Sequence, residues 1–127
     1  ILFGKLRPYL AKVYLSTFEG ICSTEFLVFY GVNSEYMQKL LLSDFFIKIV
    51  DASTYGAKMP RASATFINNI MVPYTALEEQ EKISSYLEDI EKKISRAISI
   101  KQQEIEKLKE YKTVLIDNVV TGKVRVN

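Results

Sequence analysis

The sequence contains no histidine and only one cysteine, Cys22. Histidine is the commonest general base and the commonest metal ligand, so its absence argues against most hydrolytic and metal-dependent centres. A single thiol excludes an internal disulfide and a thiolate zinc site, and it fits a reducing, cytoplasmic compartment. Glycine-rich phosphate loops are missing too, and no apolar run approaches the roughly 20 residues that span a membrane. We therefore do not expect an enzyme confined to this chain.

What the chain does contain is enough apolar material for a folded core, since 48% of its 127 residues are hydrophobic. The formal net charge is only +2, which gives no strong signal for a polyanionic partner. The basic excess lies in residues 1–72, which hold seven of the 17 Lys and Arg residues but five of the 15 acidic ones. Residues 73–127 are neutral and charge-mixed.

Two kinds of pattern predict an α+β fold, in which a small mixed globular domain is followed by one long α-helix that packs in an antiparallel pair. The globular part shows short aromatic and β-branched runs separated by turn residues. Its predicted elements are a strand–turn–strand unit over residues 1–15, a buried strand over 25–30, a helix from Ser34 to about Val50, a loop over 53–64 and a strand over 65–72.

The back third of the chain predicts a single long helix, because residues 75–121 contain neither glycine nor proline. Thr75 and Glu78 have the spacing of a capping box, and Gly122 supplies a stop. Apolar residues recur about every 3.6 positions and form a stripe on one face. The stripe comprises Ile83, Leu87, Ile90, Ile94, Ile98, Ile105, Leu108 and Leu115, the predicted helix-pairing seam.

This helix is on the order of 65 Å long, which is too long for residues 1–72 to cover its stripe. The stripe therefore needs a partner, either another copy of the chain or another segment of a longer one. The alternative is an intramolecular core, which we expect at most for the first two turns. Lys101 interrupts the stripe and is a candidate for setting the register of pairing.

Two stretches combine cations with turn residues: 4–12 carries Lys5, Arg7 and Lys12, and 56–63 carries Lys58 and Arg61. Cationic side chains on irregular backbone are well placed to contact a phosphate chain. We expect these five residues near DNA, with the lysines on phosphates. Ordinary surface lysines remain an alternative, as does an Arg61 that braces its own loop.

Taken in order, several stretches resemble the specificity subunits of type I restriction–modification enzymes. Residues 3–12 are similar to that family's F-x-K-x-R-P-x-x-x-K pattern, and 56–63 to its G-x-x-M-P-R-x-S loop. The other matching stretches are Ser23–Val28 (S-x-E-F-x-V), Leu77–Ile83 (the start of a spacer helix), Ile105–Lys112 (I-x-x-L-K-x-Y-K) and Val120–Val124 (V-T-G-K). The resemblance covers nearly the whole chain.

The resemblance implies a division into three parts. Residues 1–74 would be the C-terminal part of a DNA target recognition domain, with the remainder preceding Ile1. Residues 75–121 would be the conserved spacer and dimerisation helix, and 122–127 a C-terminal extension.

As a non-catalytic subunit, the chain would recognise one DNA half-site and dock the methylation and restriction subunits. A second recognition unit or a second copy would pair with the long helix. S-adenosylmethionine would bind the methylation subunit, and this chain would hold no cofactor and no metal. The alternative from another class is a structural coiled-coil module whose globular head binds protein.

Overall fold

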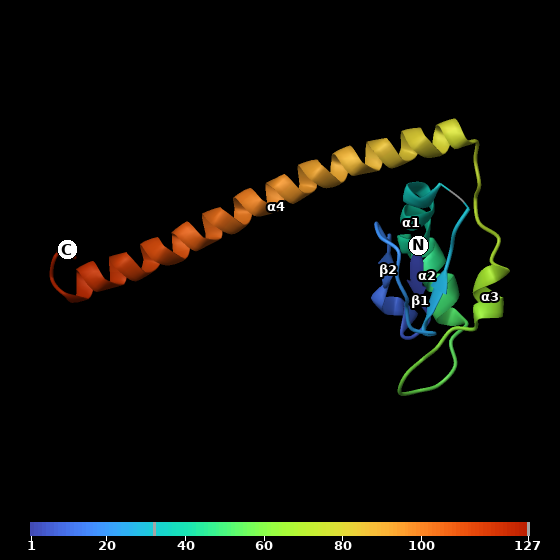
Figure 1. Cartoon of the computed structure of the whole chain (residues 1–127). Coiled ribbons are helices and arrows are strands. Elements are labelled where there is room, and N and C mark those ends of the chain that lie inside the picture. Colours follow the sequence, from blue (N-terminus) through green and yellow to red (C-terminus); the bar gives the residue numbers. More distant parts are fainter. Residues whose placement is uncertain (32, 127) are drawn as a thin grey trace. The chain divides into compact units, whose positions relative to one another are not determined.

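The computed structural model describes residues 1–31 and 33–126. Val32, inside the predicted recognition part, and Asn127, the last residue of the predicted extension, lie outside the described residues. The chain forms two compact units, residues 1–85 and 86–127. Figure 1 shows the elements, which are small strands and short helices up to α3 and then the long α4.

The first unit is built on a three-stranded antiparallel sheet with the order β2-β1-β3. The strands are β1 (Leu2–Gly4), β2 (Val13–Tyr14) and β3 (Phe26–Val28). The predicted strand–turn–strand unit is confirmed, and its turn is the 3-10 helix η1 (Pro8–Leu10). The predicted strand over 25–30 is also present, but it lies at the sheet edge and Val28 is exposed, so it is not fully buried.

Side chains alternate between the two faces of this sheet because successive residues of a strand point to opposite sides. Phe3 pairs with Val13 on one side and Leu27 on the other, and all three contribute to the hydrophobic core. Leu2 pairs with Tyr14 and Val28, which places these three on the outer face.

The single helix predicted from Ser34 to Val50 is wrong, because the chain forms two helices, α1 (Ser34–Leu42) and α2 (Asp44–Ala52). Ser43 separates them with an extended backbone. Its hydroxyl donates to the carbonyl of Leu40 at 2.6 Å and accepts from the amide of Phe46 at 3.3 Å, so it ends one helix and caps the next. The cap of α1 is Asn33, one residue before the predicted Ser34.

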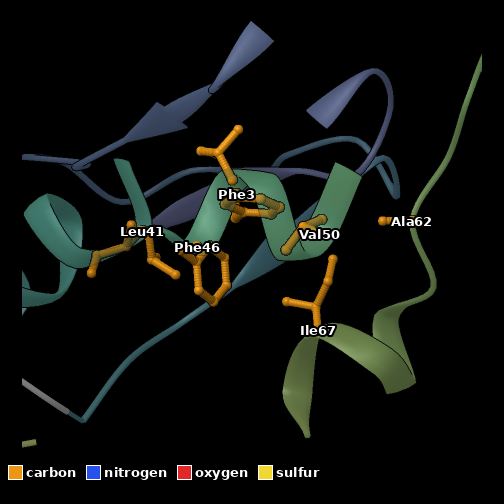
Figure 2. Packing of buried hydrophobic residues seen from close by; sticks show 8 residues of the cluster. Phe3, Leu41, Phe46, Val50, Ala62 and Ile67 are labelled. Atoms are coloured by element: carbon orange, nitrogen blue, oxygen red, sulfur yellow. The ribbon is translucent and has the colours of Figure 1, made fainter. Parts of the chain in front are cut away.

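The core lies between the inner face of the sheet and these helices. Figure 2 shows Phe3 against Phe46 and Val50, with Leu41 beside Phe46 and Ile67 beside Val50. The rings of Phe3 and Phe46 meet edge to face, with centroids 5.5 Å apart. Residues from both ends of the unit thus share one buried cluster.

The strand predicted over 65–72 is also wrong. Ser63 instead caps a short helix, α3 (Ala64–Asn68), and residues 69–76 continue without regular structure. The β-branched residues that suggested a strand serve another purpose, since Ile67 is buried in the core and Ile70 and Val72 pack against it. Tertiary packing overrides the local β-propensity here.

The predicted long helix is present as α4 (Leu77–Val120). The predicted capping box is not formed, because the hydroxyl of Thr75 donates to the carboxylate of Glu79 rather than capping with Glu78. At the other end the predicted glycine stop is confirmed. Gly122 has a φ of 75°, its amide donates to Val119, and the amide of Lys123 donates to Asn118 at 2.8 Å, which is a Schellman ending.

Together these elements confirm the predicted α+β class, with one long C-terminal helix. No helix in residues 1–31 or 33–126 has the length and apolar character needed to cross a bilayer.

Candidate nucleic-acid interface

The two cationic stretches come together because the chain pairs them through its backbone. The amide of Arg7 donates to the carbonyl of Pro60 at 2.7 Å, and the amide of Ala62 donates to the carbonyl of Lys5 at 3.0 Å. Between these bonds, Leu6 faces Arg61 in an antiparallel bridge. Residues more than fifty positions apart in sequence are therefore neighbours on the surface. We call residues 5–12 and 55–61 the basic loop pair.

Arg7 and Ala11 carry positive φ angles of 51° and 47° on either side of the 3-10 helix η1. Residues with a Cβ rarely adopt this left-handed backbone, which costs roughly 1–2 kcal/mol per residue. The Arg7 amide is held by Pro60 and the Ala11 amide by Pro8, and these bonds stabilise the conformation. Backbone strain of this kind is concentrated at functional sites.

Lys12 is fixed against the buried Gly4. The amide of Gly4 donates to the carbonyl of Lys12 at 2.8 Å. A Cβ built on Gly4 would lie 3.1 Å from Cβ and 3.3 Å from Cε of Lys12. The Lys12 stem therefore packs closely against Gly4, and Lys12 is exposed.

Arg61 forms an ion pair within the first unit. Its Nη2 lies 2.7 Å from Oε1 of Glu25, and both side chains are partly exposed, at 45% and 36%. The amide of Lys5 donates to the carbonyl of Glu25 at 2.9 Å, so Glu25 contacts both stretches. This pair fits the alternative in which Arg61 braces its loop, although one ion pair leaves the other guanidinium donors available.

Lys58 lies in an exposed loop with Tyr55 and Met59. The backbones of Tyr55 and Arg61 exchange two hydrogen bonds, of 3.2 and 3.0 Å, which close this loop, and Gly56 turns it with a φ of 91°. Aromatic and flexible apolar side chains beside a lysine are suited to contact a sugar or a base edge.

The structure thus brings Lys5, Arg7 and Arg61 together through backbone pairing, with Lys12 and Lys58 on the segments that continue from them. Contact of the five residues with DNA stays a prediction. No group of His, Cys, Asp and Glu side chains in the described part of the chain is arranged to hold a metal ion.

In the second unit the predicted seam is a largely exposed apolar stripe. Ile94, Ile98, Ile105, Leu108 and Leu115 are each between 41% and 60% exposed, whereas Leu87 and Ile90 are half-buried. Ile83 belongs to the first unit and is half-buried there. Its pairing role, like that of the others, stays a prediction.

Two apolar features were missed by the sequence reasoning. On the outer face of the sheet, Leu2, Tyr14 and Val28 adjoin Phe18 and Ile21 around a shallow hollow. The alternation of apolar residues in these strands was the available signal. On α4, several large exposed apolar side chains lie outside the predicted seam, namely Tyr86, Ile100 and Val114.

Comparison with known proteins places these features in context. A family model described as "Type I restriction modification DNA specificity domain" matches residues 1–110. The EcoDI specificity subunit, a type I restriction enzyme component of Escherichia coli, is 28% identical over 110 residues, which cover 78% of this chain and 24% of that protein. The MjaVIII specificity subunit of Methanocaldococcus jannaschii is 30% identical over 95 residues, covering 75% of this chain and 21% of that protein.

The chain thus spans about a quarter of the length of these curated relatives. No solved structure gives a significant match.

Proposed function

The chain belongs to the family of type I restriction modification DNA specificity domains, and we propose on that premise that it binds double-stranded DNA as part of a specificity subunit. The observation that carries the proposal is the backbone pairing of residues 5–7 with 60–62, which joins the cations of two distant stretches on one surface. Such a surface neutralises phosphates and fixes the position of the protein on the duplex.

Within this proposal the first unit reads one half of a split site. Lys5, Lys12 and Lys58 contact phosphates, and the loop of Tyr55 and Met59 approaches the base edges. The helix α4 pairs with a counterpart helix and fixes the distance between two such DNA-recognition units. The chain itself is not catalytic. The methylation and restriction subunits dock on it and catalyse the reactions. S-adenosylmethionine belongs to the methylation subunit.

Salt-dependent DNA binding tests the proposal. The double variant Lys5→Ala, Lys58→Ala should bind duplex DNA more weakly, and the slope of log K against log salt should fall by about one unit for each phosphate that is no longer neutralised. Lys48→Ala is the matched control, because Lys48 is exposed on α2 and already pairs with Asp44 at 2.8 Å. If affinity and slope match those of the control, the basic loop pair does not contact DNA.

The apolar outer face of the sheet favours a second candidate, a helix-pairing module whose globular head binds protein. Phe18 and Ile21 are exposed there without a covering element in the described residues. If the chain without substitutions shows no salt-dependent binding to DNA, that result would favour the protein-binding candidate over DNA binding.

A further inference from the structure

The start of α4 belongs to the first unit, because residues 77–85 group with it. We propose that Gln80 is the positioning residue that holds these first two turns of α4 on the first unit. The hold itself does not depend on DNA binding. Its consequence for DNA recognition rests on the proposed function: Gln80 joins the unit that recognises DNA to the helix that sets the distance between two such units.

Gln80 lies at a position where the sequence pattern of α4 calls for an apolar residue. The seam runs back from Leu87 to Ile83, and the next step of three residues falls on Gln80. Its side chain is nevertheless buried, at 1% exposure, and Ser84 one turn later is 4% exposed. The neighbouring Ser85 is exposed. One face of the first two turns of α4 is therefore turned into the first unit.

The hydrogen bonds of Gln80 explain why a polar side chain occupies this position. Its Nε2 donates to the carbonyl of Thr75 at 2.7 Å, and its backbone amide donates to the carbonyl of Ala76 at 3.0 Å. Its Oε1 is buried and has no hydrogen-bond partner among the described residues, which is costly. An apolar side chain of the same size would avoid that cost, so the contribution of Gln80 lies in the bond to Thr75.

The segment that Gln80 holds is also held from α1. The hydroxyl of Tyr36, a buried residue of α1, donates to the carbonyl of Pro73 at 3.3 Å. Residues 73–76 have no regular structure, yet α1 binds the carbonyl of Pro73 and α4 binds that of Thr75. Tyr36 and Gln80 thus fix the same short segment from its two sides, and together they fix the point at which α4 begins.

The accessibility of a thiol tests this hold. On a Cys22→Ser background, which removes the exposed native thiol, Ser84→Cys introduces a buried thiol and Ser85→Cys an exposed one. The thiol at position 84 should react with a thiol reagent at least about tenfold more slowly than that at 85, because it reacts only when the start of the helix detaches. Adding Gln80→Met keeps the size of the side chain and removes the donor, and should raise the labelling rate at 84 roughly five- to tenfold.

Two further variants accompany this measurement. Gln103→Met is the matched control, because Gln103 is an exposed glutamine of the same helix, and it should leave the labelling rate at 84 unchanged. Tyr36→Phe should raise that rate, because it removes the bond to Pro73 on the other side of the segment. Equal labelling rates at 84 and 85 would overturn the proposal, as would a rate at 84 that Gln80→Met leaves unchanged.

Urea separates a positioning role from a contribution to overall stability. Detachment of two helical turns exposes little surface, so the faster labelling should depend only weakly on urea, whereas labelling through global unfolding rises steeply with urea. A steep dependence in the Gln80→Met variant would mean that Gln80 only stabilises the first unit, and would overturn the proposal.

DNA binding by the same variants keeps this proposal separate from the proposed function. Gln80→Met should bind duplex DNA as tightly as the chain without that substitution, because Gln80 lies outside the basic loop pair. A chain that binds no DNA while the thiol at 84 behaves as expected would overturn only the proposed function. A chain that binds DNA while the thiols at 84 and 85 react equally would overturn only the hold by Gln80.

Discussion

Arg61 and Glu25 form an ion pair of 2.7 Å between segments 36 residues apart, at the edge of the surface where the two cationic stretches meet. The pair explains how an acidic residue is kept beside a proposed phosphate-binding surface. It also ties the loop before α3 to the residue that precedes β3. Because both side chains are partly exposed, the pair contributes less than about 1 kcal/mol to stability.

Replacing Glu25 with Gln should strengthen DNA binding, because it removes a negative charge beside the cations and releases the Arg61 guanidinium. The free energy of unfolding should fall by less than about 1 kcal/mol. A salt titration of DNA affinity and a urea unfolding curve measure the two effects. Glu19→Gln is the charge-matched control, since Glu19 lines the hollow on the outer face of the sheet. Equal affinities for the two variants would mean that Arg61 serves only to brace its loop.

Two aspartates on the seam should abolish helix pairing. Ile94→Asp with Leu108→Asp places charge on side chains that are 53% and 60% exposed in the single chain and that pairing would bury. Light scattering should show the mass fall to that of one chain while circular dichroism keeps its helical signal. Ser99→Asp with Thr113→Asp adds the same charge to the opposite face and should leave the mass unchanged. Identical masses for both variants would contradict pairing through the seam.

The junction between α1 and α2 should depend on one hydroxyl. Ser43→Ala removes the acceptor for the Phe46 amide and the donor to Leu40, and should lower the free energy of unfolding by about 1 kcal/mol. Ser34→Ala is the comparison, because the sequence pattern suggested Ser34 as the cap while the structure uses Asn33. Urea unfolding should show a much smaller loss for Ser34→Ala, and the reverse order would contradict the assigned cap.

The core should be sensitive to the removal of two methyl groups at Val50, which is fully buried beside Phe3. Val50→Ala should lower the free energy of unfolding by about 2 kcal/mol, because it reduces the buried apolar area and leaves a cavity. The same change at Val28, which is 54% exposed on the outer face, should cost less than about 0.5 kcal/mol. Similar losses at the two positions in thermal or urea unfolding would argue against the packing in Figure 2.

The long helix could be predicted from sequence because its signals are local and repeated: no helix breaker, a regular stripe and a terminal glycine. The break at Ser43 could not, since the stripe of apolar residues continues across it and only the side-chain hydrogen bonds reveal the new cap. The prediction of a strand over 65–72 was wrong because the local pattern is ambiguous. Its apolar residues suit either conformation, and the burial of Ile67 among distant residues decides between them.

The proposed DNA site was visible in sequence as two cationic stretches, but their proximity was not. That proximity depends on long-range backbone bonds between residues 5–7 and 60–62, which have no local signature. The partner of Arg61 was equally invisible, because Glu25 lies in a third segment. Residue types thus indicated the chemistry of the surface, and the backbone pairing of residues 5–7 with 60–62 determined which cations share it.

The central strand of the sheet is the one nearest the beginning of the chain. β1 pairs with both β2 and β3, and it carries Phe3 into the core. A deletion that removed residues 1–4 would therefore take away both strand partnerships and the aromatic contact with Phe46 at once. Shortened versions of the protein should be cut from the C-terminal end of α4, where the loss is confined to helix, and never through the first four residues.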